Sequence, residues 1–287
     1  MPKFNTGGAE IHYEERGTGP LAYVYCHGLG GSGERFERDD MDWYAQHFRT
    51  ISWDNRGLGR SGQSNRYSLP DYASDLAKLL DELNVDEADI FGVSWGGVVA
   101  QRFGLDYPDK CAALVLDSTS SEVNVAASEY WYARGEIARV GMEAALGGKS
   151  IAPAFAGHAT ASENSQRPVP DEQIPSYVAQ CRATAGMREH PLTAEITRLA
   201  MPVLVIGAGK DTVAGAGGSV ILSRNIKPYY KTIKSSMIMS WIKFMLILII
   251  NPPIIHEICM MMTDWHNISN ILKFLSVLLY HLSLIHI

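Results

Sequence analysis

The sequence predicts an α/β protein with a doubly wound, mostly parallel sheet and an inserted helical cap. Short apolar runs alternate with helical stretches, which is the pattern of βαβ units. Two of these runs, Ala112–Leu116 and Pro202–Ile206, contain no polar side chain, as is typical of strands buried on both faces of a parallel sheet. The stretch between these two runs is Ala-rich and helical in pattern, which breaks the alternation. We therefore expect the cap at residues 119–199.

The other elements follow in order along the first half of the chain. Short runs rich in apolar and β-branched residues predict strands at 10–15, 21–26, 50–53 and 88–91. A charged helical stretch ends near Phe48, a helix is expected at 70–83 with Pro70 in its first turn, and another at 98–105. We expect the sheet domain in two parts, residues 1–118 and 200–275, followed by a tail at 276–287.

Length and composition narrow the class of protein. The chain has 287 residues, of which 46% are hydrophobic and 20% charged, so it can bury a sizeable core. Its net charge of −6 argues against a nucleic-acid surface, which needs a basic patch. The four cysteines lie far apart without a CxxC pair, so neither a zinc site nor a disulfide framework is indicated. No secretory signal opens the chain, and we expect a cytoplasmic protein.

The composition changes abruptly after Gly218. Residues 219–287 contain no glycine or alanine but fifteen isoleucines, and their charge is positive, with 6 basic against 2 acidic residues. Either this segment has evolved differently, or it is not the natural continuation of the chain, for example after a shifted reading frame. Its most apolar stretch, residues 237–250, is shorter than the roughly 20 residues of a membrane span. We therefore expect a buried strand or helix there and no membrane span.

A Gly-x-Ser-x-Gly pentapeptide, Gly92–Gly96, stands between the predicted strand 88–91 and a helical stretch that begins at Gly97. A sharp strand-to-helix turn of this kind exposes its serine above the sheet, and the flanking glycines allow neighbouring backbone to approach. The start of the helix would favour negative charge that develops at the serine. Ser94 is therefore the candidate nucleophile. The alternative is a glycine-rich turn whose serine has no role.

Three segments, in this order and spacing, resemble the α/β-hydrolase fold family, with small capped esterases and enol-lactonases as the most similar members. They are HGLGGSG, DNRGLGRSG and FGVSWGGVVAQRFGLDYPDKCAALVL, and the resemblance extends over residues 9–211. The last segment also resembles bacterial polyhydroxyalkanoate depolymerases. The resemblance implies a serine hydrolase that cleaves carboxylic ester or lactone bonds of a small molecule through an acyl-enzyme, without a cofactor or metal.

The resemblance also assigns the oxyanion hole and the catalytic acid. Backbone N–H groups of Leu29, which follows His27-Gly28, and of Trp95, which follows the nucleophile, are expected to bind the oxyanion. His27 is expected to brace its loop rather than to act as the base. After the strand 202–206, GAGKD matches the family's acid loop, so Asp211 is the expected acid. The alternatives are Asp117, one strand earlier, or an exposed loop aspartate without a role.

The base is expected near the end of the chain, because the family places its histidine after the acid. A predicted strand at 245–250, a loop that contains His256 and a helical pattern that ends near Leu275 match the family's ending, so His256 is the expected base. Two features depart from that ending: no glycine precedes the histidine, and 45 residues separate it from Asp211. Without this base, the chain would be a non-catalytic binding protein on the same fold.

A nicotinamide-dependent oxidoreductase is the other alternative class. Gly28, Gly30 and Gly33 follow a strand with the spacing of a dinucleotide fingerprint, and Asp54 ends the next strand. Against this reading, His27 precedes the glycines, the next helical stretch is heavily charged, and Ser94 stays unexplained.

The segment DNRGLGRSG, residues 54–62, predicts a turn rather than a site. Asp54 and Arg56 would pair across it, while Gly57 and Gly59 would supply the positions with positive φ.

Overall fold

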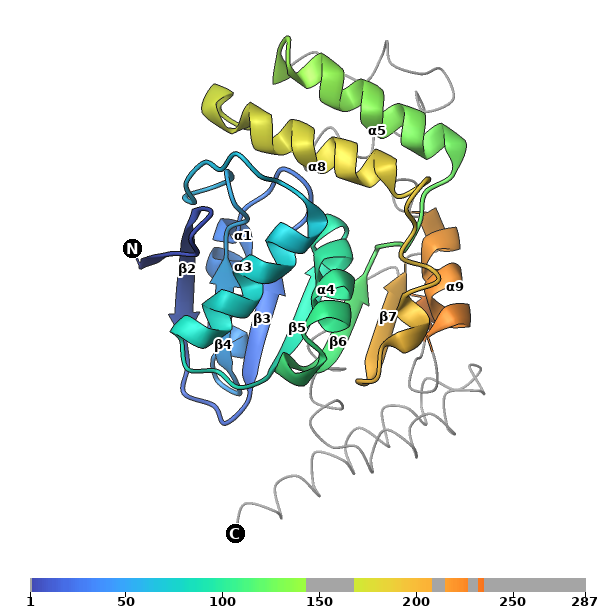
Figure 1. Ribbon diagram of the computed structural model, residues 1–287. Coiled ribbons are helices and arrows are strands. Elements are labelled where there is room, and N and C mark those ends of the chain that lie inside the picture. Colours follow the sequence, from blue (N-terminus) through green and yellow to red (C-terminus); the bar gives the residue numbers. More distant parts are fainter. Residues whose placement is uncertain (1, 143–167, 208–214, 227–231, 235–287) are drawn as a thin grey trace. The chain divides into compact units, whose positions relative to one another are not determined.

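The computed structural model describes residues 2–142, 168–207, 215–226 and 232–234 (Figure 1). Their strands form one eight-stranded sheet in the order β1-β2-β4-β3-β5-β6-β7-β8. The pairs β1–β2 and β2–β4 are antiparallel, and every pair from β4 to β8 is parallel. The predicted doubly wound, mostly parallel sheet is therefore confirmed.

The strands agree with the predicted ranges to within two residues wherever a strand was predicted among the described residues. Their bounds are β1 Lys3–Asn5, β2 Glu10–Arg16, β3 Ala22–Cys26, β4 Arg49–Trp53, β5 Ala88–Val93, β6 Cys111–Asp117, β7 Val203–Gly207 and β8 Thr232–Lys234. The central strands are almost entirely buried, as expected of a parallel sheet that is covered on both faces. Strands β1 and β8 were not predicted, because three residues are too few for a periodic pattern.

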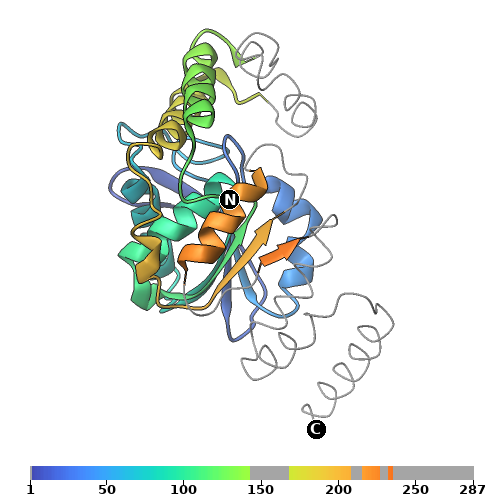
Figure 2. The same ribbon diagram turned by 90° about the vertical axis from the view of Figure 1, so that its right-hand side faces the viewer.

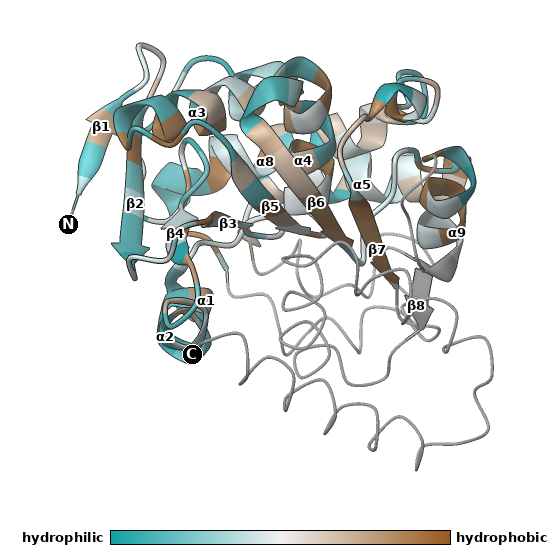
Figure 3. Cartoon of the chain, turned by 90° about the horizontal axis from the view of Figure 1, so that it is seen from below, coloured by the Kyte–Doolittle hydropathy of each residue, from teal (hydrophilic) through white to brown (hydrophobic). Residues whose placement is uncertain are grey.

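Helices cover both faces of the sheet. The described helices are α1 Glu34–Asp39, α2 Met41–Tyr44, α3 Leu69–Glu82, α4 Trp95–Asp106, α5 Val125–Ala138, α8 Ile174–Gly186 and α9 Gly215–Asn225. Figure 3 shows α3 and α4 on one face and α1 and α2 on the other. The charged stretch predicted as one helix is thus two short helices, and α4 begins at Trp95 rather than at residue 98.

Local sequence determines where α3 begins and which face it buries. Ser68 caps the helix by accepting a hydrogen bond from the Asp71 N–H, while the Asp71 carboxylate accepts from the Ser68 N–H. This reciprocal capping box satisfies two backbone donors that the first turn would otherwise leave without acceptors. The buried face of α3 carries Leu76, Leu79 and Leu80, at the spacing of one helical face.

Aromatic side chains fill the opposite side of the sheet, under α1 and α2. Tyr23 of β3 stacks on Tyr44 of α2 with ring centroids 4.7 Å apart, and Tyr25 stacks on Phe36 of α1 at 4.4 Å. Stacked aromatic pairs contribute beyond the area that they bury. Stacked aromatic pairs therefore join the helices α1 and α2 to this face of the sheet.

Helices α5 and α8 lie between β6 and β7 in the sequence, where the cap was predicted. Figure 1 and Figure 2 both show them beyond the carboxyl ends of the strands, side by side. They pack closely, because a Cβ on Gly135 of α5 would stand 3.0 Å from the Cβ of Cys181 in α8. The cap bounds 119–199, and the domain bounds 1–118, 200–275 and 276–287, remain predictions.

Helix α9 and strand β8 extend the fold past Gly218, where the composition changes. Strand β8 pairs with β7 in parallel register, with Ile233 opposite Ile206. Residues 232–234 of the atypical segment are therefore part of the sheet. The strand predicted at 245–250 and the helical pattern after it lie outside the described residues. Among the helices that the structure describes, none is long and apolar enough to cross a membrane.

Candidate active site

Ser94 occupies the turn between the carboxyl end of β5 and the first residue of α4. Its backbone has φ 54° and ψ −117°, a conformation that costs an L-residue on the order of 1–3 kcal/mol and persists only when the surroundings enforce it. The side chain is partly accessible, whereas Trp95 next to it is buried. The strand–turn–helix context predicted for the pentapeptide is therefore observed.

Close approaches of neighbouring atoms explain the three glycines around Ser94. A Cβ on Gly92 would stand 2.4 Å from the Gly96 carbonyl oxygen, and one on Gly96 would stand 2.1 Å from the carbonyl oxygen of Cys26 in β3. A Cβ on Gly97 would meet the Thr119 side chain at 2.6 Å. All three distances are below any contact that a methyl group tolerates, so the turn needs glycine at each position.

Hydrogen bonds to the end of strand β6 and to the residues after it hold the turn from the other side. The Ser94 N–H donates to the Asp117 carbonyl oxygen at 2.9 Å, and the Thr119 hydroxyl donates to the Ser94 carbonyl oxygen at 2.7 Å. The same carbonyl oxygen accepts from the Gly97 N–H at 2.9 Å. These bonds fix both peptide groups of Ser94, which offsets part of the strain in its backbone.

The loop after β3 lies directly beside Ser94. A Cβ on Gly28 would stand 3.7 Å from the Ser94 Cβ. The loop closes as a β-turn in which the Gly31 N–H donates to the Gly28 carbonyl oxygen at 3.1 Å and Gly30 has φ 65°. The closing hydrogen bond of a β-turn does not involve the N–H groups of its two central residues. The central residues here are Leu29 and Gly30.

Two backbone amides near Ser94 therefore remain available to a ligand. Among the residues that the structure describes, the Leu29 N–H has no hydrogen-bond acceptor. The Trp95 N–H has none either, because Trp95 is the first residue of α4 and has no carbonyl partner one turn earlier. Amides of this kind, at a helix N-terminus and in a tight turn, can bind negative charge that develops on a substrate.

His27 uses both ring nitrogens to support the loop. Its Nε2 accepts a hydrogen bond from the Asn55 N–H at 2.9 Å, and Nδ1 lies 2.8 Å from the Gly28 carbonyl oxygen. Because Nε2 accepts, the proton resides on Nδ1 and donates to Gly28. Burial lowers the pKa of the ring, which favours this neutral form. The geometry agrees with the bracing role expected of His27, since neither nitrogen is left to take a proton from Ser94.

The turn after β4 differs in one respect from the prediction. Asp54 does not pair with Arg56. Its carboxylate accepts from the Arg60 guanidinium at 2.8 Å and from the Gly33 N–H at 2.7 Å, while Arg56 pairs with Asp75 of α3 at 2.7 Å. The chain reverses within the turn, which brings Arg60 back to Asp54. The expected positive φ angles are present, 72° at Gly57 and 54° at Gly59.

Asp54 is also the residue that a dinucleotide site would need. It is fully buried, and although burial opposes its ionisation, the hydrogen bond from Arg60 and the other donors keep its pKa below the usual value. Its oxygens are engaged by Arg60 and by Gly33 of the glycine loop itself. A Cβ on Gly30 would stand 2.7 Å from the Tyr177 ring of α8, so the cap covers this loop. The arrangement does not fit a nicotinamide nucleotide laid on these glycines.

The two remaining residues of the predicted triad, Asp211 and His256, lie outside the described residues. The alternative acid, Asp117, is the last residue of β6 and is 3% exposed. Its carboxylate accepts a hydrogen bond from the Ser118 hydroxyl at 3.0 Å, and its carbonyl oxygen holds the Ser94 amide. Asp117 therefore stands at the same edge of the sheet as Ser94.

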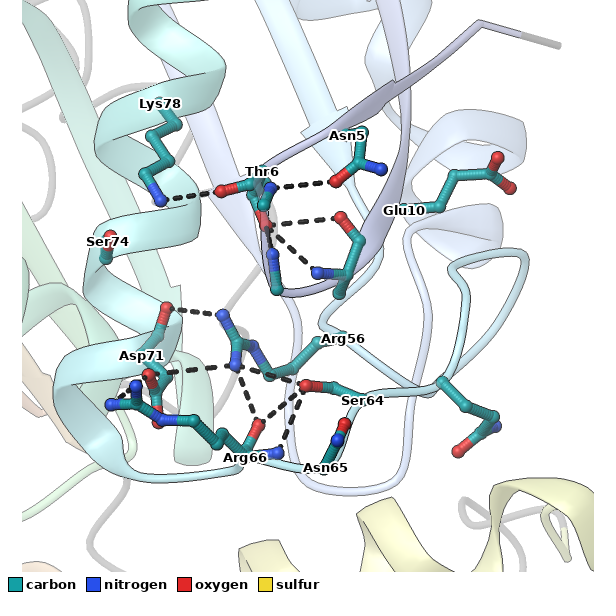
Figure 4. A pocket seen from close by; sticks show the side chains of 14 residues that line it. Asn5, Thr6, Glu10, Arg56, Ser64, Asn65, Arg66, Asp71, Ser74 and Lys78 are labelled. Carbon is teal, nitrogen blue, oxygen red and sulfur yellow. Dashed lines mark hydrogen bonds and ion pairs between the residues drawn. The ribbon is translucent and has the colours of Figure 1, made fainter.

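The hollow drawn in Figure 4 lies elsewhere. It has a volume of about 580 Å³, and its walls are the β1–β2 turn, the loop 63–66 and one side of α3. Its charged groups already have partners: Lys78 donates to the Thr6 carbonyl oxygen at 2.6 Å, and Arg66 lies 3.2 Å from the Asp71 carboxylate. Ser94 is not among the residues that line it. We therefore do not assign the reaction to this hollow.

One contact at the site could not be found from the sequence. Gln180 of α8 accepts a hydrogen bond from the Gly30 N–H at 2.9 Å, across a separation of 150 residues. A single glutamine on a helix carries no motif, and only the folded cap brings it to the loop beside Ser94.

Comparison with known proteins agrees with this fold. A family model described as the alpha/beta hydrolase fold matches residues 24–234. The putative non-heme bromoperoxidase BpoC of Mycobacterium tuberculosis is 26% identical over 218 residues, which cover 71% of this chain and 80% of that protein. The putative carbamate hydrolase RutD of Caulobacter vibrioides is 37% identical over 112 residues, which cover 37% of this chain and 41% of that protein. The enol-lactonase of Burkholderia xenovorans LB400 has the same fold, with a TM-score of 0.71 at 20% identity over 87% of this chain and 99% of that one.

Proposed function

Because this chain belongs to the alpha/beta hydrolase fold family, we propose that it is a serine hydrolase that cleaves carboxylic ester or lactone bonds. The observation that carries the proposal is the strained turn at Ser94, next to which the Leu29 and Trp95 amides have no acceptor among the described residues. Strain of this kind persists at sites where a side chain has to be held in one orientation. Relatives whose names include an enol-lactonase and a carbamate hydrolase support acyl transfer to water.

In the first half of the reaction, the Ser94 hydroxyl oxygen attacks the carbonyl carbon of the substrate while His256 accepts the hydroxyl proton. The carbonyl π electrons move to oxygen, and the oxyanion is bound by the Leu29 and Trp95 N–H groups. The tetrahedral intermediate then expels the alcohol oxygen, which receives the proton from His256. In a lactone this alcohol stays tethered to the acyl chain. Asp211 orients the imidazole throughout, and Asp117 is the alternative for this role.

In the second half, a water molecule replaces the alcohol. His256 accepts a proton from water as the oxygen attacks the acyl carbon, and the same two amides bind the second oxyanion. Collapse of the intermediate breaks the bond to Ser94, whose oxygen regains the proton, and releases the carboxylic acid. Both halves need the same base and the same anion site, so loss of either stops turnover.

The proposal is tested by the hydrolysis of short p-nitrophenyl esters and of a γ-lactone by the full chain. Ser94→Ala is expected to abolish turnover, because it removes the nucleophile. Ser74→Ala, which removes a hydroxyl from the hollow of Figure 4, is the matched control and is expected to leave kcat and KM unchanged. Turnover at the wild-type rate in Ser94→Ala would overturn the proposal. An inactive wild-type chain would favour the binding-protein alternative.

A further inference from the structure

Cap helix α8 rests directly on the loop beside Ser94. Gln180 of this helix is fully buried, and its Oε1 accepts the hydrogen bond from the Gly30 N–H at 2.9 Å. The neighbouring Tyr177 is buried too, and its ring lies where a side chain on Gly30 would have to stand. The cap therefore contacts this turn both through packing and through one directed hydrogen bond.

Two peptide groups of the turn, one on each side of Leu29, determine the orientation of the Leu29 N–H. The Leu29 N–H belongs to the same peptide plane as the Gly28 carbonyl oxygen, which accepts from the Gly31 N–H and from His27 Nδ1. The next plane, between Leu29 and Gly30, is held by Gln180 through the Gly30 N–H. Core residues thus fix the first plane, and a cap residue fixes the second.

We propose that Gln180 is a positioning residue. It couples the packing of the cap on the core to the anion site at Ser94, which consists of the Leu29 and Trp95 N–H groups. By holding the peptide between Leu29 and Gly30, it keeps the turn in the form that leaves the Leu29 N–H available to the oxyanion. Without this acceptor, the second plane is free to rotate, since Gly30 at φ 65° has access to many backbone conformations. This inference rests on the proposed function, because it assigns Gln180 a part in that reaction.

The orientation of the Gln180 amide follows from its partners. Gly30 presents a donor, so the oxygen of the amide has to face it and Nε2 faces the other way. Among the described residues, Nε2 has no hydrogen-bond partner. The bond to Gly30 is therefore the one described hydrogen bond of good geometry that the side chain makes, and the Tyr72 hydroxyl is a second polar neighbour of the amide. A methionine of similar shape would remove both polar contacts, whereas a glutamate would retain an oxygen acceptor for Gly30.

Gln173 offers a matched control on the same side of the cap. It lies just before α8, and its amide forms two hydrogen bonds with Gly59: Oε1 accepts from the Gly59 N–H at 3.1 Å, and Nε2 donates to the Gly59 carbonyl oxygen at 2.8 Å. It thus joins cap to core with the same chemical group, but on the turn after β4. Loss of cap seating in general should follow from Gln173→Met as much as from Gln180→Met.

The experiment compares Gln180→Met, Gln180→Glu and Gln173→Met with the wild type, using kcat and KM for p-nitrophenyl acetate and Ki for a trifluoromethyl ketone. Such a ketone forms a hemiketal with the serine, so its oxygen needs the anion site. Gln180→Met is expected to lower kcat and to raise Ki by about 10- to 100-fold each, which is less than the loss of a whole oxyanion donor. Gln180→Glu and Gln173→Met should stay within about threefold of wild type for both constants.

Equal effects of Gln180→Met and Gln173→Met would overturn the inference, and so would a change in KM with kcat and Ki unaltered. If Gln180→Met does not fold, Gln180→Leu and Gln173→Leu are compared with the same expected outcomes. A wild-type chain that neither turns over esters nor reacts with a fluorophosphonate would instead refute the proposed function, and this inference with it. An active wild type with indistinguishable glutamine variants refutes the inference alone.

Discussion

At the scale of single residues, the groups that support the site have hydrogen-bond partners, whereas the two amides proposed to bind the oxyanion have none among the described residues. His27 has both nitrogens engaged, Asp54 is enclosed by donors, and both peptide groups of Ser94 are held. The Leu29 and Trp95 N–H groups differ from these, because neither has an acceptor among the described residues. A buried amide without a partner costs free energy in the resting protein and binds an oxyanion more strongly for that reason.

The acid of the triad is tested at this scale by two substitutions. Asp211→Asn is expected to lower kcat by about 10³- to 10⁴-fold, because an amide at this position favours the wrong imidazole tautomer. Thermal stability should change little. A large loss in Asp117→Asn with an active Asp211→Asn would move the acid to the end of β6. Both variants are measured with p-nitrophenyl acetate at neutral pH.

Asp89 of β5 gives a prediction about pH and stability. Burial, with a smaller contribution from Glu87, raises the pKa of Asp89 to about 6. The folded state therefore binds this proton more tightly than the unfolded state does. The contribution of Asp89 to the free energy of unfolding is greatest below pH 4 and is lost as the pH rises through 6. Asp89→Asn should raise the free energy of unfolding by about 1–3 kcal/mol at pH 8.

The measurement is urea unfolding of wild type and Asp89→Asn at pH 4.5 and pH 8. The increase in the free energy of unfolding on substitution should be smaller at the lower pH, because Asp89 in the folded wild type is then mostly protonated. An equal increase in the free energy of unfolding at both pH values would show that ionisation of Asp89 does not cause the stabilisation.

At the scale of elements, the strand–turn–helix unit at Ser94 was predictable, because β5, the glycines and α4 are contiguous in the sequence. The pairing of Asp54 was not, since a turn of two glycines can bring either Arg56 or Arg60 to it, and the sequence does not distinguish them. The contact between Gln180 and Gly30 was beyond prediction for another reason. This contact depends on how the cap packs against the sheet domain, and no local sequence pattern specifies that packing.

Glycine substitutions test the packing of this unit. Gly96→Ala is expected to cost about 2–4 kcal/mol of stability and to abolish activity, because its methyl group would overlap the Cys26 carbonyl oxygen. Gly186→Ala at the end of α8 is the control: nothing lies within 4 Å of the added carbon, so stability should hold or rise slightly. Thermal unfolding followed by circular dichroism separates the two. Similar stability of Gly96→Ala and wild type would contradict the described turn.

At the scale of the whole molecule, the fold class and the strands from β2 to β7 were predictable, because the pattern of apolar residues in each run reflects burial directly. The segment after Gly218 was harder to interpret, since its isoleucine-rich composition suits strand and helix alike. The structure places α9 and β8 in the fold, which favours a family ending over foreign sequence for that portion. His256 stays a prediction that rests on the resemblance.

Substitution of each histidine after residue 218 tests whether residues 219–287 supply the catalytic base. His256→Ala should reduce kcat about as much as Ser94→Ala, because the members of a triad act as a unit. The controls His266→Ala, His281→Ala and His286→Ala should be nearly silent. Limited proteolysis gives an independent reading without substrate, and we expect residues 219–287 to be protected. Rapid cleavage there that leaves a stable remainder would count against His256 as the base.

The central claim is that Ser94 is an activated nucleophile. The most direct measurement is the reaction of the folded 287-residue chain with a fluorophosphonate, followed by mass spectrometry of its peptides. A serine activated by a base and an anion site reacts, whereas an idle serine at its ordinary pKa does not. The account predicts a single adduct, on the peptide that contains Ser94, and none in Ser94→Ala. An unmodified Ser94 in a chain that still hydrolyses esters, or an adduct on another residue, would contradict it.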